Sequence, residues 1–467
     1  MIEFDVKSNV TYINQNKITK NELKVLKQIL TFSASKKDEE PISLLENNSF
    51  FLSGLIKRVV SFLDKKNLSS SFKQPLSFFN INETCKIIDH SDYILRPYQK
   101  KVVLKCMRFK RGIIQSPTGS GKTLMQATVL NSINTPSLTV VFTDLQREQL
   151  YNFYNKMGLP ILKIKDIDRK NIKNVNDFHY VDTAITFTNY VRKTGHLKKL
   201  ELLQYDESHH LGGPSWHSLG YLIESNYRFA WSATPLENNS KKISLRDAYA
   251  IGVTGEIICT IPVSFLINKG FLHKPKINMV RYKSPLKSPN CNNWIILSRV
   301  LHGNTQRNEK IVEIAKKLVD KNYKVLVIVD KVKHGLKLLK LISKKIENTV
   351  FAKGGKQQYK ICPFTKSLIL ESSENFVKGL ESGEYKIGIG CCNYKEAIDL
   401  PSIDAGIVAC GGKSAYSIPQ IIGRYIRPKG KSPLIYDFWD HINPILKYHS
   451  KKRIELYKKY EYEVIEE

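Results

Sequence analysis

The sequence predicts an α/β protein with two parallel sheets flanked by helices and a small α/β module in front of them. Short apolar runs that end in turns alternate with helical stretches in two separate parts of the chain. This alternation is typical of parallel strands covered by helices. In the first part we expect strands at Gly112–Gln115, Leu138–Phe142, Ala184–Phe187 and Leu202–Tyr205. In the second part we expect strands at Lys324–Val329, Lys386–Ile389 and Ala405–Ala409.

Residues 1–90 are predicted to form an accessory domain, with DNA binding as one of two interpretations. The alternating Ile2, Phe4 and Val6 predict a short hairpin. Apolar residues at helical spacing predict helices at Asn21–Phe32 and Phe51–Leu63. The basic residues of this module leave two interpretations open, recognition of duplex or branched DNA and a solvated face of a capping domain. These residues are Lys57, Arg58, Lys65 and Lys66.

The remaining chain divides by composition. We expect the first sheet domain at residues 91–240 and the second at 295–445. Residues 241–294 are predicted to be a linker, because closely spaced prolines resist regular structure. These prolines are Pro262, Pro275, Pro285 and Pro289. Residues 446–467 are predicted to be a charged tail, with Lys451–Arg453 on a solvated helix.

The charge balance favours a polyanionic partner. The 467 residues include 73 Lys and Arg against 43 Asp and Glu, a net charge of +30. Neutralising phosphates releases counterions and favours such binding; the alternative is that the excess charge is spread over solvated faces. Eight cysteines without a CxxC pair argue against a zinc site or a disulfide framework and suit a reducing compartment. Without a signal-like start or an apolar run of about 18 residues, we expect a cytoplasmic protein with no membrane partner.

A phosphate-binding loop is the strongest single motif. Ser116-Pro-Thr-Gly-Ser-Gly-Lys-Thr123 follows a predicted strand and precedes a helical run. Glycines let backbone N–H groups face phosphates, Lys122 can reach the β and γ phosphates of ATP, and the Thr123 hydroxyl can bind Mg²⁺. Ser116 stands where the usual pattern has its first glycine. The predicted ATP-binding residues of this loop are Pro117, Thr118, Gly119, Ser120, Gly121, Lys122 and Thr123.

An acidic pair, Asp206 and Glu207, directly follows a predicted strand. We expect Asp206 to hold Mg²⁺, and Glu207 to orient and deprotonate the attacking water. His209 is interpreted as a link between the ATP site and the second lobe, and His210 as structural. Farther along the chain, Arg424 and Arg427 lie one helical turn apart. A guanidinium that reaches the γ-phosphate only when two lobes close would stabilise charge in the transition state.

These motifs, in this order, resemble the DEAD/DEAH-box-like helicases of superfamily 2 over most of residues 93–445. The resemblance implies two tandem RecA-like domains and nucleic-acid-dependent ATP hydrolysis. It implies that Arg96 and Gln99, in Leu95-Arg-Pro-Tyr-Gln99, bind the nucleotide, with Gln99 reading adenine. It also implies further site residues. Asp399 would bind ATP. The residues that would couple ATP hydrolysis to the nucleic-acid path are Ser232, Thr234 and Gln420. Those that would contact the strand are Thr143, Thr188 and Asn189.

Two departures put the strand contacts of one loop in doubt. Ala397 stands where the family has glycine in Gly-Ile-Asp-Leu-Pro, and Cys391 stands where threonine is common. Three connecting segments nevertheless resemble the UvsW-type phage DNA helicases and their XPB-like relatives. They are Lys269–Lys276, Gln306–Lys310 and Val329–Gly335. The His334-Gly335 pair leaves a packing role and a functional role open.

We therefore expect an ATP- and Mg²⁺-dependent DNA helicase or translocase. The resemblance implies that it remodels branched DNA or R-loops in replication, recombination or repair. We expect a monomer, in the host cytoplasm if a phage encodes it. An RNA helicase and a duplex translocase that does not separate strands remain alternatives. A nucleic-acid-binding scaffold would lack Lys122, Glu207 or Arg427, and all three are present.

Overall fold

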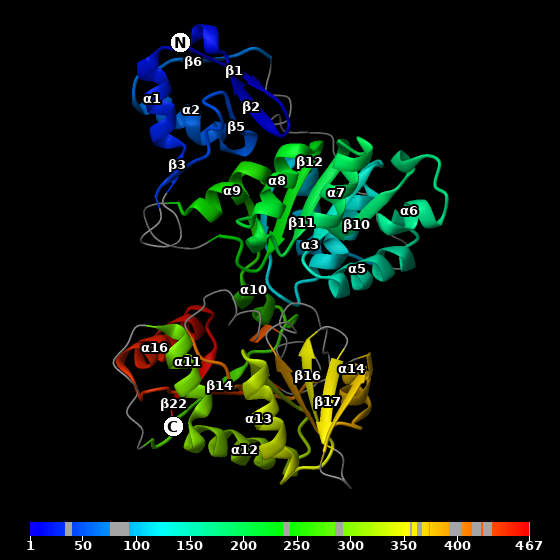
Figure 1. Cartoon of the computed structure of the whole chain (residues 1–467), viewed down its shortest axis with the longest axis vertical. Helices are drawn as coiled ribbons and strands as arrows, with labels where there is room; N and C mark the ends of the chain where they lie inside the picture. Colours follow the sequence, from blue (N-terminus) through cyan, green and yellow to red (C-terminus); the bar gives the residue numbers. More distant parts are fainter. Residues whose placement is uncertain are drawn as a thin grey trace. The chain divides into compact units, whose positions relative to one another are not determined.

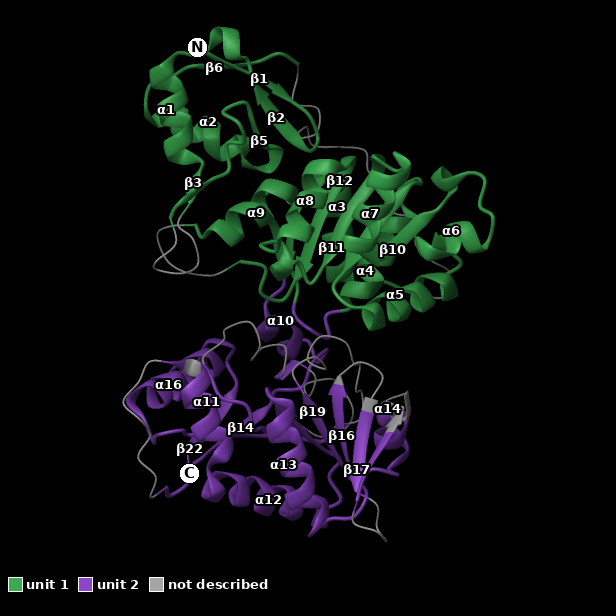
Figure 2. Cartoon of the chain, viewed as in Figure 1, with its two compact units in different colours: residues 1–116, 121–260 green, residues 117–120, 261–467 purple. Residues whose placement is uncertain are grey.

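The computed structural model describes most of the chain. The described residues are 1–32, 40–74, 93–236, 243–284, 293–354, 357–361, 367–372, 374–391, 403–412, 422–423 and 432–466. They divide into two compact units, residues 1–116 with 121–260 and residues 117–120 with 261–467 (Figure 2). No helix in these described ranges is long and apolar enough to cross a membrane.

The first unit begins with a small module built on a four-stranded sheet in the order β5-β2-β1-β6 (Figure 1). Strands β1 and β2 are antiparallel, which confirms the predicted hairpin. The predicted second helix starts later than expected, because Phe50–Leu52 is a strand and Ser53–Leu55 a 3-10 turn. The elements are β1 Ile2–Val6, β2 Val10–Ile13, α1 Lys20–Ile29, β3 Thr31–Phe32, β4 Ile42–Ser43, β5 Phe50–Leu52, α2 Ile56–Lys65 and β6 Ser70–Phe72.

A seven-stranded parallel sheet, ordered β13-β7-β12-β11-β8-β10-β9, forms the rest of the first unit. Its strands are β7 Arg111–Gln115, β8 Ser137–Val141, β9 Ile161–Leu162, β10 His179–Thr183, β11 Lys199–Asp206, β12 Glu224–Ser232 and β13 Ile257–Thr260. Its helices are α3 Pro97–Phe109, α4 Lys122–Asn131, α5 Asp144–Lys156, α6 Lys165–Arg169, α7 Ala184–Thr194, α8 Pro214–Leu222 and α9 Leu245–Thr254. The predicted strand at Ala184–Phe187 is wrong, because those residues begin α7.

The module packs tightly onto the parallel sheet and shares one apolar core with it. Arg111 Nη1 donates to the Ser8 carbonyl at 3.2 Å, and Asn9 Nδ2 donates to the Tyr221 carbonyl at 2.7 Å. A Cβ on Gly54 would lie 1.9 Å from the Ile251 carbonyl oxygen, so only glycine allows this approach.

The second unit is built on a nine-stranded sheet ordered β18-β17-β16-β19-β15-β20-β21-β14-β22. From β16 to β22 all neighbours are parallel, and β17 runs antiparallel to both β16 and β18. Its strands are β14 Lys276–Val280, β15 Val325–Val329, β16 Thr349–Gly354, β17 Gln357–Ile361, β18 Leu368–Ser372, β19 Ile387–Cys391, β20 Ala405–Val408, β21 Leu434–Phe438 and β22 Glu463–Glu466. Its helices are α10 Val263–Asn268, α11 Trp294–Gly303, α12 Thr305–Asp320, α13 Val332–Ser343, α14 Glu374–Ser382 and α16 Pro444–Lys459.

Two predicted boundaries are wrong. The predicted linker at 241–294 contributes α9 and β13 to the first unit and β14 to the second sheet. The predicted tail contains most of α16 and β22, the last strand of the second sheet. Arg453, read as solvated, is 2% exposed. Both segments contain apolar residues at the spacing of helices or strands. Prolines interrupt that spacing in residues 241–294, and lysines interrupt it in residues 446–467.

Buried arginines of the second unit are paired with carboxylates. Arg453 Nε donates to Asp437 Oδ2 at 2.8 Å, and Arg307 Nε donates to Asp440 Oδ1 at 2.8 Å. Tyr457 adds a hydroxyl donor to Asp437 Oδ2 at 2.7 Å. All five groups are at most 2% exposed. Buried charges are tolerated when they are paired and hydrogen-bonded in this way.

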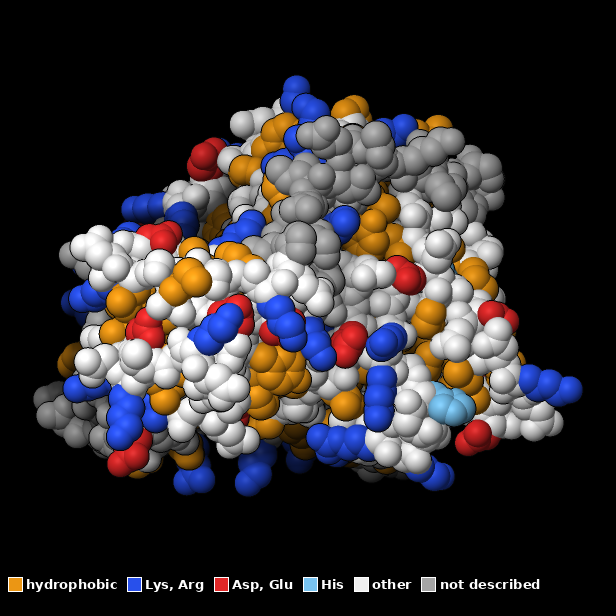
Figure 3. Space-filling model, turned by 90° about the horizontal axis from the view of Figure 1, so that it is seen from above, with side chains coloured by type: hydrophobic (Ala, Val, Ile, Leu, Met, Phe, Trp, Pro, Cys, Tyr) orange, Lys and Arg blue, Asp and Glu red, His pale blue; other side chains and the backbone are white. Residues whose placement is uncertain are grey.

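The excess positive charge is spread over the surface in the view of Figure 3. Lys and Arg side chains lie among Asp and Glu side chains there and do not gather in one patch. In the N-terminal module, Arg58 forms a two-pronged ion pair with Glu256, whereas Lys57, Lys65 and Lys66 are exposed. Nucleic-acid recognition by these lysines stays a prediction.

Candidate ATP-hydrolysis site

The phosphate-binding loop connects β7 to α4 through two left-handed glycines. Gly119 has φ +81° and Gly121 has φ +80°, conformations that residues with a Cβ rarely adopt. Ser120 Oγ donates to the Pro117 carbonyl at 2.7 Å, which closes the turn. Because α4 starts at Lys122, its free N–H groups and dipole favour an anion at this end. Ser116, in place of glycine, is buried, its N–H donates to the Ser232 carbonyl at 2.8 Å, and it is not among the residues with positive φ.

Gln99, the predicted adenine reader, lies against this loop. A Cβ on Gly121 would be 2.2 Å from Gln99 Nε2, so the side chain occupies the space that glycine leaves. Gln99 Oε1 accepts the backbone N–H of Arg96 at 2.8 Å. The structure therefore brings Gln99 to the phosphate loop, while reading of adenine by Gln99 and Arg96 stays a prediction.

Lys122 and Glu207 form the central ion pair of the site. Lys122 Nζ lies 2.9 Å from Glu207 Oε1, and both side chains are 13% exposed. Burial raises the pKa of Glu207, but Lys122 and His209 outweigh it and hold the pKa well below its ordinary value. Glu207 also adopts a left-handed backbone, φ +52°, directly after β11. Such strained positions cluster at functional sites.

Asp206 lies at the end of β11, where its carboxylate is hydrogen-bonded by Gln126. The distance from Gln126 Nε2 to Asp206 Oδ1 is 3.1 Å. Burial is the main cause that raises the pKa of Asp206, and the neighbouring Glu207 raises it further, against the opposing effect of Lys122. Sequence reasoning missed Gln126, although its position one helical turn after Lys122 places it on the same face of α4.

His209 connects the acidic pair to the Ser-Ala-Thr segment within the first unit. His209 Nδ1 lies 3.4 Å from Glu207 Oε2 and 3.3 Å from Ser232 Oγ. Ser232 Oγ in turn accepts the backbone N–H of Thr234 at 3.2 Å. The structure thus brings the predicted coupling residues His209, Ser232 and Thr234 together with Glu207. A link from His209 to the second lobe stays a prediction.

The residues predicted to contact a strand separate into two groups. Thr143 caps α5 and is half-buried, and Asn189 is exposed on α7. Thr188 is only 6% exposed because it faces the core side of α7, and its predicted strand contact stays a prediction. Thr183, which sequence reasoning missed, caps α7 with its hydroxyl. The missed signal was a threonine directly before the helical run.

Four predicted site residues lie outside the described residues: Asp399, Gln420, Arg424 and Arg427. Their roles stay predictions. The altered loop residue Ala397 is also outside the described ranges, whereas Cys391 ends β19 and is buried.

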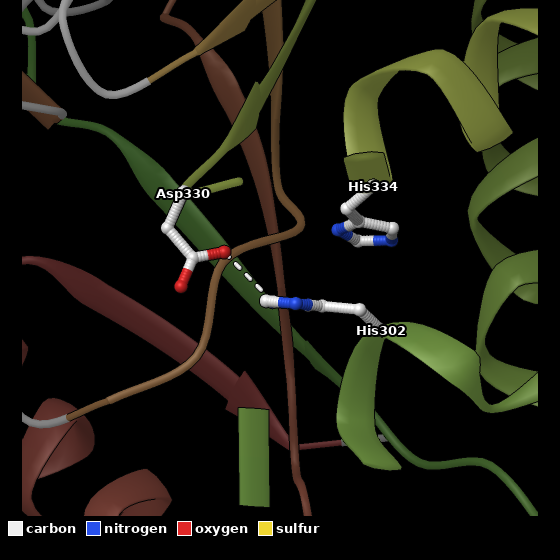
Figure 4. Close-up of side chains that lie close together, drawn as sticks. All are labelled: His302, Asp330 and His334. Atoms are coloured by element: carbon white, nitrogen blue, oxygen red, sulfur yellow. Dashed lines mark ion pairs between the residues drawn. The ribbon is translucent and has the colours of Figure 1, made fainter. Parts of the chain in front are cut away.

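A histidine cluster in the second unit deserves comparison with metal sites. His302, Asp330 and His334 bring ligand atoms within 4.8 Å of one another (Figure 4). The two rings are stacked, however, with centroids 4.5 Å apart and an interplanar angle of 20°. Nitrogen lone pairs lie in the ring plane, so stacked rings aim them side by side, whereas Zn²⁺ needs them to converge at about 2.0–2.1 Å.

The same cluster has a packing explanation. His302 Nε2 lies 2.7 Å from Asp330 Oδ1, and His334 is 2% exposed with Nε2 2.9 Å from Asn308 Oδ1. A Cβ on Gly335 would lie 2.4 Å from the Phe351 ring. These contacts favour the packing role that the sequence left open for His334-Gly335.

Part of the chain matches a known protein family, and two known proteins are similar to most of it. Residues 92–237 match the family described as type III restriction enzyme, res subunit. The DNA 3'-5' translocase XPB2 of Sulfurisphaera tokodaii is 25% identical over 374 residues, covering 73% of this chain and 81% of that protein. The ATP-dependent DNA helicase uvsW of Enterobacteria phage T4 is 24% identical over 437 residues, covering 86% of this chain and 81% of that protein.

Solved structures support the fold. Dbp5 of S. cerevisiae, bound to RNA and ADP BeF3, has a TM-score of 0.54 at 12% identity and covers 79% of this chain and 89% of that chain. This likeness shows the fold alone. The fold is that of tandem RecA-like domains, and the matching family and relatives indicate a class of ATP-hydrolysing proteins. More particularly, the chain is similar to the DNA helicase uvsW and the DNA translocase XPB2.

Proposed function

We propose that the chain is an ATP-driven DNA helicase or translocase that acts as a monomer on branched DNA or R-loops in replication, recombination or repair. The names of the two relatives, a DNA translocase and a DNA helicase, support DNA as the partner. The choice of branched or hybrid substrates rests on the resemblance to UvsW-type helicases.

The observation that carries the proposal is the ion pair between Lys122 and Glu207. Phosphates that enter the loop compete with Glu207 for the Lys122 ammonium, which lies 2.9 Å from that carboxylate. Once Lys122 turns to phosphate, Glu207 loses the main cation that lowers its pKa. The pKa of Glu207 then rises toward the range in which a carboxylate accepts a proton from water. Substrate binding itself would therefore prepare the general base.

The residues at this edge fit a magnesium ion. Asp206 offers a half-buried carboxylate that Gln126 hydrogen-bonds, and Thr123 is the second residue of α4. Mg²⁺ held by Asp206 and Thr123 would neutralise phosphate charge. Asp206 would contribute its anionic oxygen, and the hydrogen bond from Gln126 would restrict the position of that carboxylate.

The contacts of His209 suggest how nucleic acid influences hydrolysis. His209 Nδ1 contacts both the Glu207 carboxylate and the Ser232 hydroxyl. A shift of the Ser232–Thr234 segment would move His209 and thereby Glu207. Arg424 and Arg427 are proposed to add positive charge in the transition state.

The test is ATP hydrolysis with no nucleic acid, single-stranded DNA, duplex, four-way junction, R-loop and RNA. We expect the greatest stimulation from the junction or the R-loop, and loss of that hydrolysis in Lys122→Ala. Lys156→Ala is the matched control, because Lys156 is an exposed lysine at the end of α5. Hydrolysis that survives Lys122→Ala would contradict the site, and stimulation by RNA alone or equally by plain duplex would contradict the substrate.

A further inference from the structure

Phe142 is a large apolar side chain that the structure leaves 46% exposed. It follows β8 at the carboxyl edge of the first parallel sheet and precedes Thr143, the cap of α5. Single exposed apolar residues are common on protein surfaces and need no partner. Phe142 is distinguished by the way its ring is held.

The ring of Phe142 is stacked on His210. Their centroids are 3.8 Å apart and their planes differ by 5°. Behind them lies Trp216, which is 5% exposed and has its ring centroid 5.4 Å from that of His210. Because His210 covers one face of Phe142, the exposed area lies on the other face and on the ring edge.

The backbone at Phe142 is fixed as well. The N–H groups of Phe142 and Thr143 both donate to Gln146 Oε1, at 3.1 Å and 3.0 Å. Thr143 Oγ1 accepts the Gln146 N–H at 3.2 Å, and a hydroxyl that accepts can still donate to a phosphate oxygen. The aromatic face is therefore positioned before any partner binds.

Two helix starts lie beside this ring. Strands β8 and β10 are neighbours, and Val141 is paired with Thr183, so α5 and α7 begin at the same edge of the sheet. Each helix start favours phosphate through its N–H groups and dipole. Ile185, 61% exposed, adds a second apolar side chain at this edge. A nucleic-acid strand offers both chemistries, phosphates for the helix starts and base faces for the aromatic ring.

We propose that Phe142 is a stacking platform for an unpaired nucleobase, with His210 and Trp216 supporting its ring. This inference rests on the proposed function and sharpens it. In a continuous duplex both faces of each base are covered by neighbouring bases, so a platform of this kind selects strands with unpaired bases. Unpaired bases occur at branch points and in the displaced strand of an R-loop.

The test compares two single-stranded DNA oligonucleotides of equal length by fluorescence anisotropy at one salt concentration. One is oligo-dT and the other carries tetrahydrofuran abasic sites, so the phosphates are the same and only the bases are missing. We expect the full-length protein to bind oligo-dT about 5- to 150-fold more tightly, the range for stacking of one base. Phe142→Ala is expected to remove this ratio by weakening oligo-dT binding alone.

Three variants separate stacking from structural damage. Phe142→Tyr keeps an aromatic ring and should keep the ratio. Leu145→Ala is the matched control, because Leu145 is 42% exposed on the first turn of α5. His210→Ala should lower the ratio, since it removes the support of the ring. A full ratio in Phe142→Ala, with normal thermal unfolding, would overturn the inference.

Failure of this inference differs from failure of the proposed function. If wild type binds both oligonucleotides equally and DNA still stimulates its ATPase, the platform is wrong and the helicase function stands. If DNA neither binds nor stimulates hydrolysis, the proposed function itself is wrong.

Discussion

Both units place carboxylates at the carboxyl edge of a parallel sheet, but the cations that neutralise them differ. In the first unit, Glu207 is paired with Lys122, a single ammonium on a side chain that is 13% exposed. In the second unit, Asp437 is paired with Arg453, whose guanidinium also donates to the Gly412 and Phe438 carbonyls at 2.8 Å and 2.7 Å. Arg453 is 2% exposed.

The difference separates a carboxylate that we propose to be catalytic from one that is structural. Lys122 can exchange Glu207 for a phosphate, because the ammonium is one flexible donor beside an anion-binding loop. The Arg453 side chain cannot exchange its partner in this way, because moving away from Asp437 would break several buried hydrogen bonds at once. An exchangeable partner thus makes a carboxylate available for chemistry, and a locked partner makes it part of the core.

The largest expected effect is on the exchangeable pair. Glu207→Gln removes the proposed base, so we expect kcat for ATP hydrolysis to fall about 10²- to 10⁴-fold. ATP affinity should be retained, because Lys122 is freed to bind phosphate. Single-turnover hydrolysis and a fluorescent ATP-binding assay measure both. Glu201→Gln, a change on the same strand where Glu201 accepts from Asn226, is the control. Wild-type turnover in Glu207→Gln would remove the basis of the comparison.

The locked pair should respond in stability. Arg453→Met leaves Asp437 buried without its main cation, and we expect the free energy of unfolding to fall by about 3–5 kcal/mol. Lys452→Met is the matched control next to it, because its pair with Glu455 is exposed and screened by solvent, so its loss should change stability little. Urea unfolding measures both changes. Equal effects of the two substitutions would mean that the buried pair is not structural.

A smaller effect, the loss of stability at acid pH, should be similar in both units, because each unit buries a neutral histidine. Burial lowers the pKa of His179 to about 4, and burial, with His302 and Arg307 adding, lowers the pKa of His334 to about 2. Each group binds a proton more readily when unfolded, so its contribution is present above pH 6.5 and is lost as pH falls below it.

The loss should approach 1.4 kcal/mol per pH unit for each histidine, or about 2 kcal/mol at pH 5. Urea unfolding between pH 7.5 and 5 measures the slope. His179→Phe should reduce the slope, whatever it does to stability at pH 7.5. An unchanged slope would show that His179 does not contribute.

The sequence predicted those parts of the site in which short-range chemistry decides the structure. Lys122, Asp206 and Glu207 follow strands in local motifs, and the structure brings them together as expected. Placement failed where a local cap was overlooked and where tertiary contacts decide. Ala184–Phe187 is apolar and β-prone, yet Thr183 caps it as a helix. Thr188 belongs to a motif with polar side chains, but its turn of α7 faces the core.

The run of basic residues around Arg453 also led to a wrong prediction, because tertiary contacts decide which of them is buried. Arg453 sits in a run of basic residues, and only Asp437 and Asp440, close to one another in the fold, explain why it is buried. The stack of Phe142 on His210 joins residues from two separate strand ends. No pattern along the chain could reveal either contact, because neither partner lies within one turn or one hairpin of the other.

The order of strands in the second sheet has a consequence for synthesis. Strand β14 is flanked by β21 and β22, so neither neighbour of residues 276–280 exists until residues 434–438 and 463–466 have been made. At about 5–20 residues per second, β14 waits roughly 8–30 s for its first partner. During that time Ile277, Met279 and Val280, at most 2% exposed in the folded chain, have no sheet to cover them. The first unit can fold during synthesis before these residues are made, whereas the second sheet cannot be completed until residues 434–438 and 463–466 have been added.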